Sequence, residues 1–163
     1  MITVFQTYTC KEKFHCDFNI WEKIPFVKQY IPIINERKNL LKTDFIISHN
    51  PFSSSSLQGI LNKCKTKYIL LIPGTESINL PKENIFRFLQ IAEYSNSGII
   101  YSDYLVNENE NNILPNPLID YQKGSVRDDF DFGKMIMINT EAAKSVFKKN
   151  DYLYAGWYDL RLR

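Results

Sequence analysis

The sequence has few cysteines, no long apolar run and no surplus of one charge. Three cysteines, an odd number in a chain of 163 residues, do not form a framework of disulfide bonds. The longest apolar segments are far shorter than the roughly 20 residues that span a bilayer as a helix. The 20 basic and 18 acidic residues are interspersed, so the sequence offers no charged block that would bind a nucleic acid or a membrane.

Two further features are missing. Cys10, His15 and Cys16 lie close together, but the fourth ligand of a familiar zinc spacing is absent, so we interpret them as ordinary thiols and a surface histidine. The first residues, MITVFQTYTCKEKF, lack the basic region, apolar stretch and cleavage site of a secretory signal. We therefore expect a cytoplasmic protein.

The sequence does contain enough apolar material for one folded domain, with 44% hydrophobic and 14% aromatic residues. Its most informative stretch runs from Tyr68 to Ile72 and ends at Pro73-Gly74. Because this stretch is apolar without alternation, it predicts a strand that is covered on both faces. Thr75 and Glu76 follow at its carboxyl end, where open parallel sheets bind ligands; alternatively, they form a polar turn that only connects two elements.

Strand and helix patterns alternate around this stretch. Strands are expected over Ile2–Thr7, Asp44–Ser48, Gly98–Tyr101 and Lys134–Ile138. Helical spacing predicts helices that begin at Ser55 or Ser56, at Asn79, and at Asn139 or Thr140. A strand, a helix and a strand in this order imply parallel neighbours with a right-handed connection, so the expected fold class is α/β.

Three connecting regions carry further signals. Asp17 can cap a short helix, but Pro25 and Pro32 interrupt any helical period, so an irregular crossover is expected there. The polar run NENENN at 107–112 predicts the tip of a hairpin. His49, which follows a strand, could act as a general base or bond a base edge or ribose; as an isolated loop histidine it would do neither.

Acidic side chains follow several of the expected strands. Glu76 and Asp103 stand at strand ends, and Asp128, Asp129 and Asp131 form a cluster beside two phenylalanines. Carboxylate oxygens suit magnesium or manganese, and such an ion cancels the charge of a diphosphate. The alternative for the cluster is a surface ion pair with the preceding arginine.

From Asp44 onward, the order of segments resembles that of the family 2 inverting glycosyltransferases of the GT-A fold. YILLIPGTES occupies the position of the family's Y-V-L-F-L-D-x-D-D, and FIISHNPFSSSS that of a strand ending in V-V-D-D-G-S. The segment from FGKMIMINTEAAKSVF to YAGWYDLRLR resembles the acceptor-side strand and helix and the following E-D-x-D-L-x-L-R. The blocks YSDY, IDYQKGSVRDDFDFG and AGWYDLRLR together look like those of a bacterial subgroup that keeps them while losing the usual aspartates, so that its metal-binding motif is degenerate.

The resemblance implies a GT-A-like, Rossmann-like sheet that is mostly parallel and has flanking helices, in a single domain over residues 1–163. It implies an enzyme that transfers a sugar from a nucleotide-diphosphate donor to a glycan or lipid-linked acceptor, at the inner face of the membrane, in the making of cell-envelope polysaccharide. Glu76 and Asp103 would hold a manganese or magnesium ion. The donor-binding residues would be Thr7, Ser48, His49, Asn50, Thr75, Glu76 and Asp103.

The resemblance also points to a catalytic base. In the family this is the aspartate of E-D, and Gly156 and Trp157 stand at those positions here. Asp159 is the nearest carboxylate, so either Asp159 or a member of the cluster formed by Asp128, Asp129 and Asp131 would deprotonate the acceptor hydroxyl.

Two alternatives stand beside this reading. The chain could be a non-catalytic GT-A-like module that binds a nucleotide, a glycan or a partner chain after losing the aspartates. A nucleotidyltransferase on a similar sheet fits less well, because no glycine-rich phosphate loop with a basic residue follows the first strand. Leu160 and Leu162 are followed by no helix stop signal, which predicts that the native protein extends past Arg163.

Overall fold

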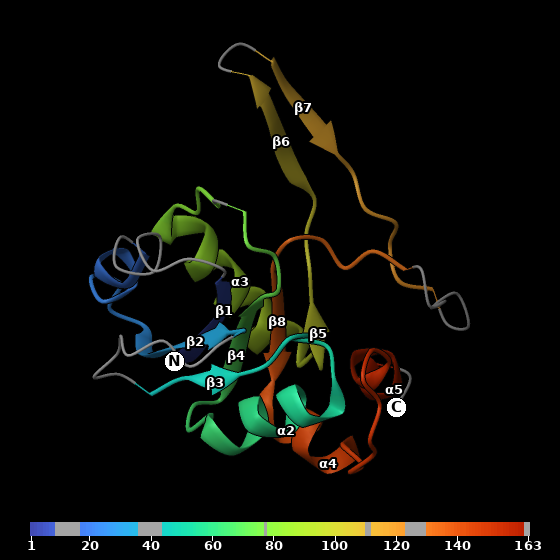
Figure 1. The fold of residues 1–163 in the computed structure, drawn as a ribbon. Helices are drawn as coiled ribbons and strands as arrows, with labels where there is room; N and C mark the ends of the chain where they lie inside the picture. The colour runs from blue at the N-terminus through green and yellow to red at the C-terminus, as the bar shows by residue number, and fades with distance from the viewer. Residues whose placement is uncertain (9–16, 36–43, 77, 110–111, 123–129, 162–163) are drawn as a thin grey trace.

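The computed structural model describes residues 1–8, 17–35, 44–76, 78–109, 112–122 and 130–161 as a six-stranded sheet with helices on both faces and a separate two-stranded ribbon (Figure 1). The sheet contains β1 (Ile2–Tyr8), β2 (Val27–Ile34), β3 (Ile46–Ile47), β4 (Tyr68–Ile72), β5 (Ile99–Ile100) and β8 (Ile136–Asn139). A helical turn spans residues 17–21. The remaining helices are α2 (Ser54–Lys63), α3 (Lys82–Ser95), α4 (Thr140–Val146) and α5 (Gly156–Arg161).

The strand order in the sheet is β3-β2-β1-β4-β8-β5. The pairs from β3 to β4 are parallel, and β8 runs antiparallel to both β4 and β5. The chain adds β2 and β3 on one side of β1 and then returns to place β4 on its other side. In open α/β sheets such a reversal of strand order is where ligands bind, outside the carboxyl ends of the two strands. The predicted α/β fold with a mostly parallel, Rossmann-like sheet is confirmed, and its switch point lies between β1 and β4.

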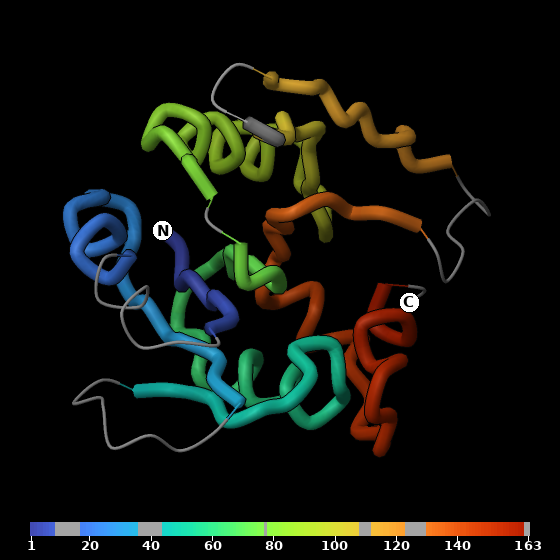
Figure 2. The backbone as a smooth tube through the Cα atoms, turned by 45° about the horizontal axis from the view of Figure 1, so that its top comes forward, coloured from blue at the N-terminus to red at the C-terminus, as the bar shows by residue number. Residues whose placement is uncertain are grey.

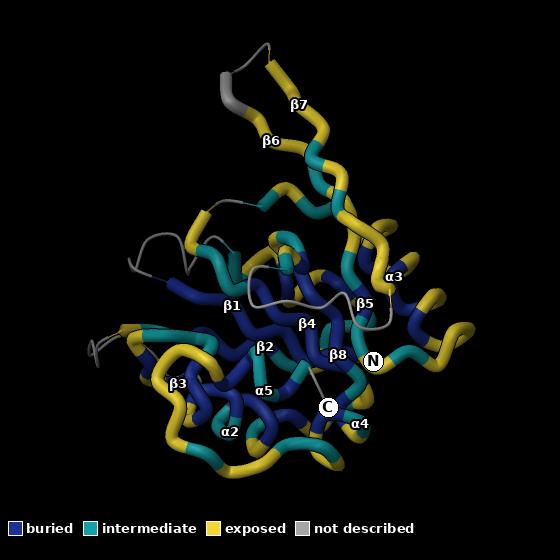
Figure 3. The backbone as a smooth tube through the Cα atoms, turned by 90° about the vertical axis from the view of Figure 1, so that its right-hand side faces the viewer, coloured by how far each residue is buried: buried dark blue, intermediate teal, exposed yellow. Residues whose placement is uncertain are grey.

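Both faces of the sheet are covered, as the apolar run of β4 predicts. Every residue from Tyr68 to Ile72 is at most 1% exposed, and β1 is buried along its whole length. The helical turn at 17–21 and α3 cover one face, while α2, α4 and α5 cover the other (Figures 1 and 3). On α3 the predicted stripe of Ile85, Phe88, Leu89 and Ala92 is buried against the sheet.

The prediction of an irregular crossover before Asp44 is wrong, because residues 27–34 form the strand β2. Pro32 does not break this strand: β3 pairs with β2 only at Ile33 and Ile34, so Pro32 lies where no ladder partner is needed on that side. The expected short helix after Asp17 is present as the turn at 17–21. The strand expected over Asp44–Ser48 is reduced to the two residues of β3.

The helix starts are only partly as expected. Ser53, one turn earlier than Ser56, caps α2 by accepting a hydrogen bond from the Ser56 backbone N–H. Pro81 precedes α3 and makes no side-chain cap, so Asn79 does not cap that helix. The Asn139 side chain does cap α4, where it accepts hydrogen bonds from two backbone N–H groups.

The two-stranded ribbon projects away from the sheet (Figures 1 and 2). Its strands β6 (Tyr104–Asn109) and β7 (Asn112–Asn116) are antiparallel, which confirms the predicted hairpin, although residues 110–111 at its tip lie outside the described residues. Within the described part of the chain, the structure contains no helix that is long and apolar enough to cross a membrane.

Candidate functional site

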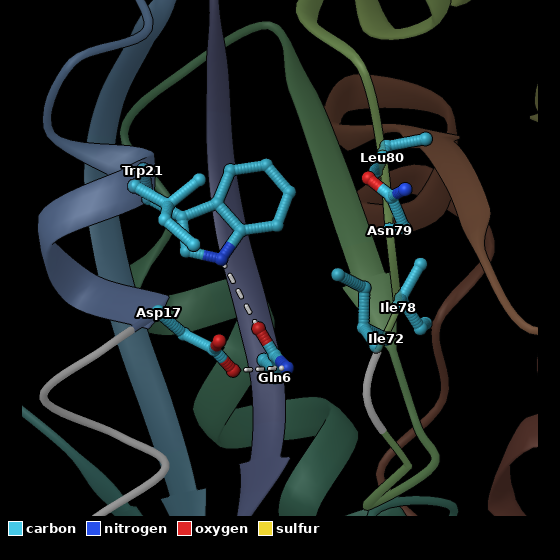
Figure 4. A pocket seen from close by; sticks show the side chains of 8 residues that line it. Gln6, Asp17, Trp21, Ile72, Ile78, Asn79 and Leu80 are labelled. Carbon is cyan, nitrogen blue, oxygen red and sulfur yellow. Dashed lines mark hydrogen bonds between the residues drawn. The ribbon is translucent and has the colours of Figure 1, made fainter.

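A small pocket opens at the switch point, between the helical turn at 17–21 and the segment that follows β4. Its volume is about 90 Å³. In Figure 4, Asp17, Trp21 and Gln6 stand on one side of the opening and the segment after β4 stands on the other. The lining residues are Gln6, Asp17, Ile20, Trp21, Ile72, Ile78, Asn79 and Leu80.

Gln6, near the end of β1, organises the floor of this pocket. The side chain is 2% exposed and makes three hydrogen bonds. Its Oε1 accepts from Trp21 Nε1 at 3.1 Å and from the Tyr30 hydroxyl at 3.2 Å. Its Nε2 donates to Asp17 Oδ2 at 2.9 Å. A buried amide that is satisfied by partners from three other positions has a fixed orientation.

Two buried tyrosines complete this network. The Tyr8 hydroxyl donates to Asp17 Oδ2 at 2.7 Å and is also hydrogen-bonded to the Tyr30 hydroxyl. Burial raises the pKa of both phenols, and for Tyr8 the neighbouring Tyr30 and the Asp17 carboxylate raise the pKa further. The phenols therefore stay protonated at neutral pH, and Tyr8 can hold the Asp17 carboxylate in place as a donor.

Sequence reasoning missed this network. Asp17 is expected only to cap a helix, and Gln6, Tyr8, Trp21 and Tyr30 are not expected to take part in a site. The available signal is Gln6, because a polar side chain in a strand that is otherwise fully buried must find partners. Those partners come from residues that are distant in sequence, so only the fold identifies them.

Thr7 points to the other face of β1, since successive residues of a strand alternate. Its side chain is 6% exposed, and its Oγ1 has no hydrogen-bond partner among the described residues. Leaving a buried hydroxyl unpaired costs about 1–3 kcal/mol, which a bound ligand could offset. Thr7 is thus a predicted donor-binding residue that is buried near the end of β1, and its hydroxyl has no hydrogen-bond partner among the described residues.

Ser48 and Asn50 instead hold the turn that leads into α2. Ser48 Oγ donates to the Asn50 carbonyl at 2.8 Å and accepts a hydrogen bond from Ser56 Oγ. Asn50 Oδ1 accepts from the Phe52 backbone N–H at 2.9 Å, and its Nδ2 donates to the Leu153 carbonyl at 3.1 Å. Through these contacts, both side chains stabilise the turn before α2.

The strand β3, which leads to Ser48, lies at the edge of the sheet. Because β2 is inserted between β3 and β1, the residue that follows the strand next to β1 is Asn35, which is exposed. His49 is exposed as well, two strands away from β1. The donor-binding roles of Ser48, His49 and Asn50 therefore stay predictions.

On the other side of the switch point, Lys134 lies where three loops meet. Its Nζ lies 3.4 Å from Glu76 Oε1, after β4, and 5.7 Å from the ring centroid of Tyr104. Gly133 has a φ of 74°, and a Cβ there would lie 3.1 Å from the Ser102 carbonyl oxygen. The loops after β4, after β5 and before β8 thus meet at one place.

Two more predicted acids belong to these loops. Asp103 Oδ1 accepts from the Leu118 backbone N–H at 2.7 Å, and Asp131 Oδ1 accepts from the Gly133 backbone N–H at 2.7 Å. Glu76, Asp103 and Asp131 thus lie on the three loops that meet around Gly133 and Lys134, and we call these loops the acidic loops. Thr75, next to Glu76, is exposed. Asp128 and Asp129 lie outside the described residues, so their roles stay predictions.

A metal ion at Glu76 and Asp103 also stays a prediction. Glu76 pairs with Lys134, and one Asp103 oxygen is used by a backbone N–H. Across the ranges that the structure describes, no group of three or more His, Cys, Asp or Glu side chains could hold a metal ion. The described residues do not by themselves fit a metal, and Cys10, His15 and Cys16 lie outside them.

The carboxyl-terminal helix α5 explains why the family's acidic pair is absent at Gly156 and Trp157. A Cβ on Gly156 would lie 2.5 Å from the Ser54 backbone nitrogen, so no side chain fits there. Trp157 is 6% exposed and packs in the core. Asp159, the expected substitute, accepts a hydrogen bond from Asn150 Nδ2 at 3.2 Å, in the linker before α5.

Comparison with known proteins finds a similar fold but no matching family. No family model and no curated protein sequence matches the chain. Among solved structures, the fold is similar to that of HddC from Yersinia pseudotuberculosis, with 10% sequence identity and a TM-score of 0.51. The alignment covers 95% of this chain and 82% of HddC. At this identity the likeness supports the α/β fold alone.

Proposed function

We propose that the chain is a nucleotide-sugar-dependent glycosyltransferase domain that binds its donor at the carboxyl ends of β1 and β4. The observation that carries this proposal is the reversal of strand order between these two strands, with a pocket on one face of β1 and an unpaired buried hydroxyl, Thr7 Oγ1, on the other. Polar groups on both sides of a switch-point strand suit a ligand with a base, a ribose and phosphates.

The acidic loops would supply the chemistry. The acceptor hydroxyl loses its proton to a carboxylate, and its oxygen forms a bond to the anomeric carbon while the bond from that carbon to the diphosphate oxygen breaks. Displacement from the opposite side inverts the configuration. We assign the base to the cluster that includes Asp131, because Asp131 lies on the same loop as Lys134, and Lys134 can offset the charge on the leaving diphosphate. Asp159 is the second candidate.

Nucleotide binding tests the proposal first. Thermal unfolding with UDP, GDP and CMP, each with and without manganese, should show a higher midpoint with at least one nucleoside diphosphate. Absence of any shift with every nucleotide would contradict the proposal. The manganese arms show whether Glu76 and Asp103 contribute to a metal-dependent complex.

Turnover tests the chemistry. The paired changes Asp128→Asn and Asp129→Asn should abolish the release of nucleoside diphosphate from a nucleotide sugar, with folding unchanged. The single change Asp131→Asn should reduce this release about a hundredfold or more, also with folding unchanged. Asp151→Asn is a matched control, since Asp151 is an exposed acid in the linker before α5.

A non-catalytic binding module is the second candidate. It is favoured by the burial of Gly156 and Trp157 at the positions of the family's acidic pair, and by the ion pair that already engages Glu76. A module of this kind would show the thermal shift without any release of nucleoside diphosphate.

A further inference from the structure

The pocket beside Asp17 presents one fixed hydrogen-bond acceptor between apolar walls. Asp17 Oδ2 accepts from Gln6 Nε2 and from the Tyr8 hydroxyl. None of the hydrogen bonds made by the described residues uses Asp17 Oδ1. One oxygen of the carboxylate is thus anchored by two donors, and the other is left to accept from a ligand.

The walls of the pocket suit a flat ring. Trp21 is held by its hydrogen bond to Gln6 and by stacking on Tyr30, with centroids 6.1 Å apart and an angle of 22° between the rings. Ile78 and Leu80 stand opposite (Figure 4). A planar ligand can enter between an indole and two aliphatic side chains with little loss of shape complementarity.

We propose that this pocket binds the imide edge of a pyrimidine base, as found in uracil and thymine, and that Asp17 accepts the imide N–H. The inference rests on the proposed function, since it names the base of the same nucleotide donor. Asn79, which is exposed at the rim, can donate from its Nδ2 to a carbonyl of the base. Asp17 is therefore the residue that selects the base.

The free oxygen favours an imide edge over the edges of the other bases. Cytosine and adenine present an unprotonated ring nitrogen at the corresponding edge, which a carboxylate repels. Guanine presents two adjacent donors, and a carboxylate pairs best with both when each of its oxygens accepts one, but Oδ2 of Asp17 already accepts from Gln6 and Tyr8.

The test is the isosteric change Asp17→Asn. The new Oδ1 can keep the hydrogen bonds from Gln6 and Tyr8, while Nδ2 replaces the free oxygen, so the atom that faces the ligand changes from an acceptor to a donor. Calorimetric titration of the wild type should give tighter binding of UDP or dTDP than of CDP and GDP. In Asp17→Asn, UDP affinity should fall about tenfold or more and the preference for UDP over CDP should be lost.

Two further variants keep this test decisive. Asp44→Asn removes the same charge from an exposed acid that pairs with Lys63, and it should leave the affinities unchanged. Asn79→Asp changes an exposed residue whose replacement does not threaten folding, and it should weaken UDP binding by setting a carboxylate against a base carbonyl. The UDP and dTDP arms distinguish the two imide bases.

The outcomes separate this inference from the proposed function. If the wild type prefers GDP or CDP, or if Asp17→Asn and Asn79→Asp both bind UDP as the wild type does, the base assignment is overturned and the nucleotide-binding function survives. If the wild type binds no nucleotide, both are overturned.

Discussion

Two groups of polar side chains stand at the carboxyl edge of the same sheet, and they are built differently. Around Gln6, side chains bond to one another: Asp17, Trp21 and Tyr30 all contact the Gln6 amide, which is 2% exposed. In the acidic loops, each carboxylate bonds a backbone N–H or pairs with Lys134 in contact with solvent.

This difference predicts which of the two groups matters for stability and which matters for activity. A network of buried side chains is preorganised, and removing one member leaves others unpaired in a low dielectric. Exposed carboxylates are screened by water, so their removal costs little stability, yet they remain free to act on a bound substrate. Changes around Gln6 should therefore affect folding, while changes in the acidic loops should affect activity.

The change Gln6→Leu should have the largest effect on stability. It leaves the Trp21 indole N–H and the Tyr30 hydroxyl without their acceptor, which should lower the free energy of unfolding by about 3 kcal/mol or more. Urea unfolding measures this loss. Gln90→Leu, at an exposed position of α3, is the control and should stay within about 0.5 kcal/mol of the wild type. Equal effects of the two changes would show that the network does not stabilise the fold.

The two tyrosines make the network sensitive to alkaline pH. Because burial raises the pKa of Tyr8 and Tyr30 above the ordinary value near 10, the native state keeps protons that the unfolded chain releases. Their contribution to stability is complete below about pH 10 and is lost as the pH rises above it. The free energy of unfolding should fall by up to about 1.4 kcal/mol per pH unit for each tyrosine.

Urea unfolding between about pH 8 and pH 11 measures this slope. The double change Tyr8→Phe and Tyr30→Phe should flatten it. A slope that is the same in the double variant would mean that other groups titrate in that range.

The two groups also differ in how far the sequence predicts them. The acids at strand ends can be located from sequence alone, because β4 is an uninterrupted apolar run and Glu76 lies in the loop after it. Glu76, Asp103 and Asp131 lie on loops that meet around Gly133 and Lys134. Their partner Lys134 was not foreseen, since the positive φ of Gly133 that turns the chain there has no clear sequence signal.

The network around Gln6 could not be derived in the same way. Its formation depends on β2, which carries Tyr30 beside β1, and Pro25 and Pro32 conceal that strand in the sequence. Local propensity treats proline as a break, whereas the register of the sheet leaves Pro32 without a required donor. The strand β2 also separates β3, which leads to Ser48 and His49, from β1.

The change Glu76→Gln should have the smallest effect on stability. Whether it raises or lowers the affinity for UDP shows what Glu76 does. The ion pair with Lys134 is exposed, with side-chain exposures of 45% for Lys134 and 60% for Glu76, so the free energy of unfolding should change by less than about 0.5 kcal/mol. If Glu76 mainly occupies Lys134, its removal frees a cation for the diphosphate. UDP should then bind a few-fold more tightly to Glu76→Gln without manganese.

Lys134→Met is the matched opposite change. It should weaken UDP binding under the same conditions, because it removes the cation that would offset the charge of the diphosphate. Calorimetric titration with and without manganese separates this from a metal role. If Glu76 holds an ion, Glu76→Gln should lose only the manganese-dependent part of the affinity, and Lys134→Met should keep it. The sign of the Glu76→Gln effect therefore decides whether the acid at the end of β4 restrains a lysine or recruits a metal.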